Sequence, residues 1–204
     1  PMTDNQPTTP APSHWRRYRS LYLLLVVCIA PVLASYTAYY LLPPSGRTNY
    51  GTLVEPQRPL PALSLRRLDG TPVAAASLRG SWLMVQVDTG GCDAVCEKKL
   101  WQMRQVRLTA GKDADRVQRV WLIVDDAPLA TSVIREYDGT LFLRARADEA
   151  AAFLPLPAET GAALGDHIWL VDPLGNLMMR WPRDADPNRM KKDLGKLLKA
   201  SGIG

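Results

Sequence analysis

The sequence predicts an α/β domain that follows a single transmembrane helix. The helix is predicted by an apolar segment over residues 21–42, LYLLLVVCIAPVLASYTAYYLL, which contains no charged residue. The α/β class is predicted by a strand, helix and strand pattern over residues 82–124, because a parallel pair of strands needs a crossover helix. Composition agrees, since 47% of the 204 residues are hydrophobic, which excludes a wholly disordered chain.

The apolar segment is long enough to cross a bilayer. At about 1.5 Å per residue, it spans roughly 33 Å as a helix, which matches the hydrocarbon core. Arg16, Arg17 and Arg19 precede it and predict a cytoplasmic N-terminus. The chain is therefore expected to be a single-pass inner-membrane protein with its C-terminal domain in the periplasm. A cleaved secretion signal ending near Ala34 is the alternative, and it would export the same domain.

Four segments are expected along the chain. Residues 1–20 are predicted to be a disordered cytoplasmic tail, residues 21–42 the transmembrane helix, residues 43–61 a proline-rich tether and residues 62–204 the folded domain. The net charge is +5 for the whole chain, but the residues after 42 include 22 basic and 19 acidic side chains. That weak excess argues against a nucleic-acid partner.

Hydrophobic periodicity and turn residues predict the elements of the folded domain. The expected strands are residues 63–65, 82–87, 120–124, 141–143, 167–171 and 177–181, and the expected helices are residues 92–109, 130–137, 148–153 and 187–200. The last two strands are expected to form a hairpin, because DPLGN at residues 172–176 is a strong turn signal. The last helix is expected to be amphipathic.

Two cysteines carry the chemistry that the sequence predicts. Cys92 and Cys96 lie where the strand at 82–87 gives way to a helix, and a helix N-terminus favours thiolate over thiol. Residues four apart share one helix face, with Cβ atoms about 5–6 Å apart. The two sulfurs can therefore bind one metal ion or form a disulfide. A purely stabilising disulfide is poorly motivated, because so small a loop removes little unfolded-state entropy.

A histidine is the candidate third ligand. Two thiolates suit Cu⁺, and an added imidazole makes a site that also holds Cu²⁺. His167 opens the first hairpin strand, and ligand sites of open α/β sheets lie at strand ends of this kind. The alternative is a histidine that only packs or titrates. The remaining cysteine, Cys28, lies inside the apolar segment and is assigned no role.

These features together resemble the Sco (SenC) family. The resemblance rests on the anchor and tether, on the motif TGGCDAVC at residues 89–96, and on DH at 166–167 followed by LVDPLG at 170–175. Sco proteins are thioredoxin-like, membrane-tethered copper proteins that help to build the copper centre of cytochrome c oxidase. Glu97 stands where the family usually has a proline, so this chain resembles a divergent member.

The resemblance implies a thioredoxin-like domain in which Cys92, Cys96 and His167 bind copper. It also implies the copper-bearing subunit of cytochrome c oxidase as the recipient, with a copper donor protein as a further partner. The first hypothesis is thus a metallochaperone, which needs no catalytic turnover.

In two alternative hypotheses the protein is an enzyme and the same two cysteines are its catalytic residues. In a thiol–disulfide oxidoreductase, Cys92 attacks a disulfide of an apo-oxidase subunit and Cys96 resolves the mixed disulfide, so that His167 is dispensable. A peroxide reductase on the same fold needs one exposed reactive cysteine and a resolving partner, and the sequence offers no distinguishing residue for it.

Overall fold

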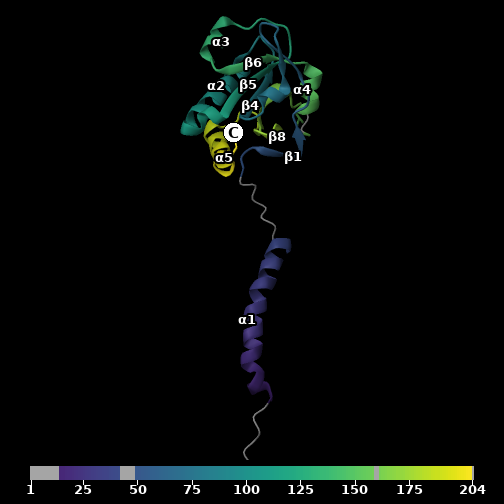
Figure 1. Cartoon of the computed structure of the whole chain (residues 1–204), viewed down its shortest axis with the longest axis vertical. Helices are drawn as coiled ribbons and strands as arrows, with labels where there is room; N and C mark the ends of the chain where they lie inside the picture. The colour runs from purple at the N-terminus through teal and green to yellow at the C-terminus, as the bar shows by residue number, and fades with distance from the viewer. Residues whose placement is uncertain (1–13, 42–48, 159–160, 204) are drawn as a thin grey trace, which may run out of the picture. The chain divides into compact units, whose positions relative to one another are not determined.

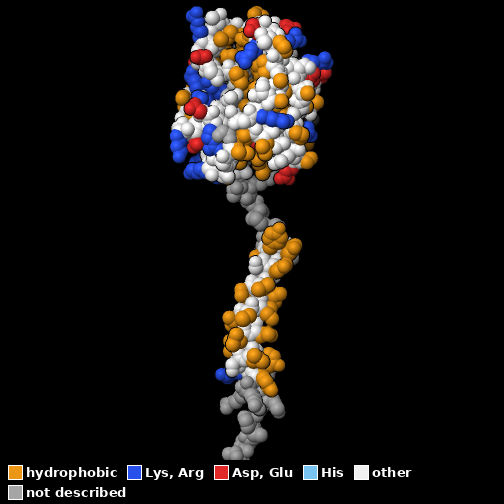
Figure 2. All heavy atoms as spheres, in the orientation of Figure 1, with side chains coloured by type: hydrophobic (Ala, Val, Ile, Leu, Met, Phe, Trp, Pro, Cys, Tyr) orange, Lys and Arg blue, Asp and Glu red, His pale blue; other side chains and the backbone are white. Residues whose placement is uncertain are grey.

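The computed structural model describes residues 14–41, 49–158 and 161–203. It contains two compact units, one with helix α1 (His14–Leu41) and one that begins at Asn49. The stretch Tyr18–Tyr40 of α1 is long and apolar enough to cross a membrane, and the protein buries none of it. Figure 2 shows hydrophobic side chains along the length of this helix.

Helix α1 begins earlier than predicted. Residues 14–20 are helical, so the expected disordered tail over 1–20 is wrong for this part, and residues 1–13 lie outside the described residues. No proline or glycine separates residues 14–20 from the apolar segment, so nothing in the sequence stops the helix at Leu21. The described helix ends at Leu41.

The second unit is built on one mixed sheet. Its eight strands, among the described residues, follow the order β1-β8-β7-β4-β5-β6-β2-β3. The strands are β1 (Thr52–Pro59), β2 (Ser64–Arg67), β3 (Pro72–Ala74), β4 (Trp82–Asp88), β5 (Val117–Ile123), β6 (Thr140–Arg144), β7 (Ile168–Val171) and β8 (Asn176–Arg180). Strands β4, β5 and β6 are parallel, while β7 is antiparallel to β4 and forms the predicted hairpin with β8. The predicted parallel unit with a crossover helix is confirmed.

Helices cover both faces of the sheet. They are α2 (Ala94–Thr109), α3 (Thr131–Glu136), α4 (Ala147–Phe153) and α5 (Pro187–Ala200), with short 3₁₀ turns η1 (Ala75–Leu78), η2 (Gly111–Arg116) and η3 (Leu164–Asp166). Helices α2 and α5 pack side by side on one side of the sheet, and α4 lies on the other side (Figure 1). These four α-helices agree with the predicted positions to within a few residues.

Strand β4 is buried on both faces, as its apolar run predicts. Met84 packs with Cys96 and Leu100 in the core between the sheet and α2. Val85 points the other way and packs in a second core with Phe153 of α4. Because side chains alternate along a strand, every even position of β4 faces α2. This alternation decides which residues lie beside the cysteines.

The first strand lies within the segment that was expected to be a tether. Thr52–Pro59 pairs antiparallel with β8, so the expectation of a tether over residues 43–61 is wrong for β1. Its prolines are compatible with a strand because β1 is at the edge of the sheet, where a missing N–H breaks no ladder. Residues 42–48 lie outside the described residues.

A buried carboxylate holds the start of this unit against α5. Asp193 of α5 accepts hydrogen bonds from the backbone N–H groups of Tyr50 at 3.0 Å and Gly51 at 2.8 Å, and from Trp181 Nε1 at 3.2 Å. Asp193 is only 2% exposed, and the hydrogen bonds from Gly51 and Trp181 are buried, so at least these two donors would lose their partner in its absence. The chain just before β1 is therefore fixed to the last helix.

Replacing Asp193 with alanine is expected to lower the free energy of unfolding by about 2–4 kcal/mol, because buried donors lose their acceptor. Urea unfolding of the full chain in detergent measures the change. Asp115→Ala is the control and is expected to leave the midpoint nearly unchanged, because the Asp115 side chain is 98% exposed. Equal midpoints for the parent and Asp193→Ala would contradict this role for the carboxylate.

Candidate functional site

A tight loop carries the chain from β4 to α2. The backbone N–H of Gly90 donates to Asp125 Oδ1 at 2.7 Å, beyond the end of β5. A Cβ atom at Gly90 would lie 2.4 Å from the carbonyl oxygen of Ala127, so the close approach requires glycine. At Gly91 the corresponding nearest atom, Thr89 Oγ1, is 4.0 Å away. The loop after β4 is thus held against the loop after β5, which sets the position of the cysteines.

The first turn of α2 is capped by a side chain. Asp93 is the N-cap residue, and its Oδ1 accepts hydrogen bonds from the N–H groups of Val95 at 3.0 Å and Cys96 at 2.9 Å. This is the usual way to satisfy the open donors at a helix start. The helix N-terminus was predicted to favour thiolate over thiol. The Asp93 carboxylate weakens this effect, because it already accepts hydrogen bonds from these N–H groups.

The structure joins Cys92 and Cys96 in a disulfide, with their Cα atoms 5.1 Å apart. Cys92 is half-buried and has a φ of 35°, in the left-handed region that few residues other than glycine adopt. Cys96 is 0% exposed and belongs to the core between the sheet and α2. An attacking thiol therefore reaches the sulfur of Cys92 and not that of Cys96.

A buried glutamine contacts the inner sulfur. The side-chain Nε2 of Gln86 on β4 lies 3.3 Å from Cys96 Sγ and 3.5 Å from the Cys96 carbonyl oxygen. Gln86 is 0% exposed, and among the described residues none donates a hydrogen bond to its buried Oε1. The amide group thus contacts the disulfide from the core side, at Cys96 Sγ.

A buried ion pair lies one helical turn further along α2. The Lys99 ammonium is 2.8 Å from Asp88 Oδ2 and also donates to the carbonyl oxygen of Gly165. Both ionic side chains are largely buried, so each neutralises a charge that would otherwise be costly to bury. The pair connects α2 to the end of β4 and to η3, the turn that precedes His167.

A tyrosine that follows α3 packs in the core between the sheet and α2. Tyr137 Oη donates to the carbonyl oxygen of Glu97 at 3.4 Å. Burial raises the pKa of the Tyr137 hydroxyl above its ordinary value, and the nearby Glu136 carboxylate adds to the rise. Tyr137 is therefore a neutral hydrogen-bond donor at any physiological pH.

His167 is buried just before β7, with an exposure of 6%. Its Nδ1 lies 2.9 Å from the carbonyl oxygen of Trp181, so Nδ1 carries the hydrogen and donates it. In the neutral ring the lone pair is then on Nε2, the arrangement in which histidines often bind metals. The ring also meets the Trp169 ring edge-on, with centroids 5.8 Å apart.

The imidazole lies toward the other face of the sheet from Cys96. Ile168 pairs with Gln86 across β4 and β7 and packs in the same core as Cys96, whereas Trp169 packs in the second core. His167 has an extended backbone, with φ −122° and ψ 155°, so strand alternation directs its side chain toward Trp169. The predicted meeting of this imidazole with the two sulfurs is therefore not seen in the disulfide form.

Of the three predicted ligands, the structure brings together only the two cysteines. Within residues 14–41, 49–158 and 161–203, no three His, Cys, Asp or Glu side chains form a group that could hold a metal ion. The sulfurs are joined to each other in this form, and only free thiolates are strong metal ligands. A metal site on these cysteines thus requires the reduced pair.

Sequence reasoning missed the polar residues below the disulfide. Gln86 and Lys99 are the two that matter most, since one contacts Cys96 Sγ and the other is a buried cation on the same helix. A signal for Gln86 was present, because it is a polar residue within the apolar run WLMVQV at 82–87. Lys99 gave no such signal, since a lysine in a helix is ordinarily exposed.

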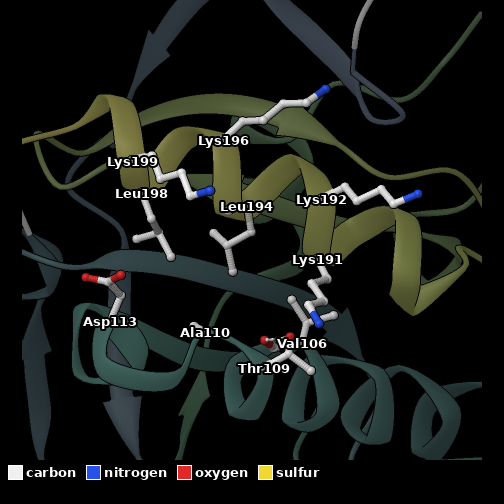
Figure 3. Close-up of a pocket in the computed structure, with 11 residues that line it drawn as sticks. Val106, Thr109, Ala110, Asp113, Lys191, Lys192, Leu194, Lys196, Leu198 and Lys199 are labelled. Atoms are coloured by element: carbon white, nitrogen blue, oxygen red, sulfur yellow. Dashed lines mark hydrogen bonds between the residues drawn. The ribbon is translucent and has the colours of Figure 1, made fainter.

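A groove of about 510 Å³ lies elsewhere, between α2, η2 and α5. Its floor includes Val106 and Leu194, and Lys191 and Lys199 are among the lysines around it (Figure 3). None of the predicted site residues lines this groove. The chemistry of the cysteines is therefore separate from this hollow.

The sheet and the cysteine pair together are typical of thioredoxin-like proteins. A thioredoxin-like sheet carries a Cys-x-x-x-Cys pair at the start of the helix that follows its central strand. A candidate membrane span precedes this domain in the sequence. The chain belongs to the family described as transmembrane-like, thioredoxin-like, C-terminal domain, which matches residues 82–201. No curated protein matches the sequence.

Solved structures share this fold at low sequence identity. Yeast Sco1 with copper bound is 17% identical with a TM-score of 0.54, over 75% of this chain and 90% of that chain. Apo Sco1 from Thermus thermophilus is 20% identical with a TM-score of 0.54, over 76% and 98%. A thiol:disulfide interchange protein from Bacteroides sp. is 19% identical with a TM-score of 0.51, over 71% and 91%. The predicted thioredoxin-like fold is confirmed.

Two adjacent glycines provide a matched test of the loop before the cysteines. Gly90→Ala is expected to lower the free energy of unfolding by about 1–3 kcal/mol, because its methyl group would overlap the Ala127 carbonyl. Gly91→Ala is expected to be neutral or stabilising by up to about 1 kcal/mol, since its methyl group meets nothing closer than 4.0 Å. Thermal unfolding of both variants measures the difference, and equal losses would contradict the close approach at Gly90.

Proposed function

We propose that this chain is a membrane-anchored, Sco-type copper-binding protein. In this proposal the reduced Cys92 and Cys96 bind copper and pass it by ligand exchange to the copper-bearing subunit of cytochrome c oxidase. One observation supports it most: the two sulfurs converge at the start of α2, in a fold shared with yeast Sco1 with copper bound. Thiolates are soft ligands that favour Cu⁺.

The different exposures of the two cysteines suit a transfer protein. Cys96 is fixed by the core and by Gln86, whereas Cys92 is half-buried and lies in the loop before α2. An incoming ligand from a copper donor or recipient can therefore replace Cys92 first, while Cys96 still holds the ion. Stepwise exchange of this kind avoids the release of free copper.

The third ligand that we propose is His167 through Nε2. In the disulfide form its Nδ1–H donates to the Trp181 carbonyl, which leaves the lone pair of the neutral ring on Nε2. To join the sulfurs, the ring must turn away from Trp169, because it now lies toward the other face of the sheet. Two thiolates alone would hold Cu⁺, and the imidazole would extend the site to Cu²⁺.

We propose an inner-membrane location with the domain in the periplasm. The three arginines at 16, 17 and 19 support a cytoplasmic N-terminus. The disulfide between Cys92 and Cys96 supports an oxidising compartment for the domain, because disulfides rarely persist in the cytosol.

The second candidate function is thiol–disulfide exchange with an apo-oxidase subunit. The disulfide itself favours it, together with the fold similarity to a thiol:disulfide interchange protein. The half-buried Cys92 would be the attacking thiol and the buried Cys96 the resolving one. This function needs no imidazole beside the sulfurs.

Copper titration separates the two functions. The full chain in detergent is reduced under anaerobic conditions and titrated with Cu⁺ against a competing chelator. The parent and Cys28→Ser are expected to bind one equivalent, and Cys92→Ser/Cys96→Ser none, because the thiolates are the ligands. His167→Ala is expected to bind Cu⁺ at least tenfold more weakly and to lose Cu²⁺ binding.

The outcomes bear on different parts of the proposal. Equal copper binding by the parent and the double cysteine variant would refute copper binding at this site and favour thiol–disulfide exchange. Unchanged binding of both copper states by His167→Ala would remove only the histidine from the site. Cys28→Ser controls for adventitious binding by the third cysteine, which lies in α1.

A further inference from the structure

We propose that Gln86 stabilises the reduced form of Cys96 and so makes the Cys92–Cys96 disulfide easier to reduce. The inference deepens the proposed function and rests on it in one respect: copper can bind only after this disulfide has been reduced. The evidence is the position of the amide, which lies within hydrogen-bond distance of the inner sulfur and away from solvent.

Burial makes the Gln86 contact important. Cys96 and Gln86 are both 0% exposed, so water cannot supply a hydrogen bond to the sulfur that is released on reduction. A thiolate or thiol left in an apolar core without a partner is unfavourable. Gln86 Nε2, at 3.3 Å from Sγ, is already in place to serve as that partner.

The other polar groups nearby are engaged elsewhere. The N–H groups of Val95 and Cys96 at the helix start donate to Asp93. The Lys99 ammonium is held by Asp88 and by the Gly165 carbonyl. The glutamine amide therefore provides the stabilisation that the helix end and the lysine do not.

The amide bonds better to reduced sulfur than to a disulfide. A disulfide sulfur is a weak acceptor, whereas a thiolate is a strong acceptor and forms a charge-assisted bond with the Nε2 hydrogen. A thiol can instead donate its hydrogen to Oε1, which has no donor among the described residues in the disulfide form. Both reduced states therefore gain from Gln86 more than the disulfide does.

The reduction step involves a dithiol reductant and balances as follows. A reductant thiolate attacks Cys92 Sγ, the accessible sulfur, which forms a mixed disulfide and breaks the Cys92–Cys96 bond. Cys96 leaves as a thiolate and receives the Gln86 N–H hydrogen bond. The second reductant thiolate then displaces Cys92, so the reductant ends as a disulfide while the two cysteines receive two electrons and take up protons.

Redox equilibrium measures the effect in the full chain. Parent, Gln86→Leu and Gln86→Met chains, each in detergent and with Cys28→Ser, are equilibrated with mixtures of reduced and oxidised dithiothreitol, and the free thiols are trapped with a maleimide. In both Gln86 variants the equilibrium is expected to shift toward the disulfide by about tenfold, or about 30 mV for two electrons. Methionine keeps the length of the side chain, which guards against a folding defect in the leucine variant.

A second buried glutamine is the matched control. Gln102 lies on α2 at 3% exposure and donates to the Ala185 carbonyl at 2.6 Å, a contact that involves no sulfur. Gln102→Leu is expected to leave the redox equilibrium unchanged, even where it lowers stability. An unshifted equilibrium in both Gln86 variants would overturn the proposal, and so would an equal shift in Gln102→Leu.

Copper titration of the same samples keeps this inference separate from the proposed function. A shifted redox equilibrium in chains that bind no copper would refute copper binding and leave the role of Gln86 standing. Normal copper binding by reduced Gln86→Leu, together with an unshifted equilibrium, would refute the role of Gln86 alone.

Discussion

The burial of β4 on both faces is the constraint on which the rest of the domain depends. The strand lies between β5 and β7 and packs against α2 on one side and the α4 side on the other. Its register with both neighbours leaves it no freedom to slide, because a shift of one residue would exchange the two faces. The chain therefore leaves β4 at one defined place, and the two cysteines follow within a few residues.

The same burial explains the polar groups that lie beneath the disulfide. A polar residue at position 86 of β4 must face α2, and there it meets the inner sulfur. The Lys99 and Asp88 pair lies in the same layer, where each charge is tolerable only because the other is present. A site of this kind is costly for stability, and such costs are common where chemistry is performed.

The two candidate functions place different demands on one pair of sulfurs. Exchange of thiols requires one accessible cysteine and one protected cysteine, and Cys92 and Cys96 differ in burial in this way. Copper binding requires both to be reduced, and the third ligand that would extend the site to Cu²⁺ must come from elsewhere in the fold. His167 lies toward Trp169 in the disulfide form, so a movement of its ring toward the sulfurs would favour copper binding over thiol exchange. Reduction is common to both, which gives Gln86 a part in either.

Local patterns in the sequence determined much of this protein. The apolar segment, the parallel unit with its crossover helix, the hairpin and the amphipathic last helix depend on periodicity and turn residues, which act over a few positions. The Cys92–Cys96 spacing likewise made either a shared metal or a disulfide possible.

Packing between elements determines which groups meet across long distances in the chain. It placed β1 on the sheet edge through β8 and Asp193, although its prolines suggested a tether. It also directed His167 toward the opposite face from Cys96, because one residue of register sets the side of a strand. The pairing of β1 with β8 and the direction of His167 both depend on packing between elements. The sequence of one element alone does not show which face of another element it will pack against.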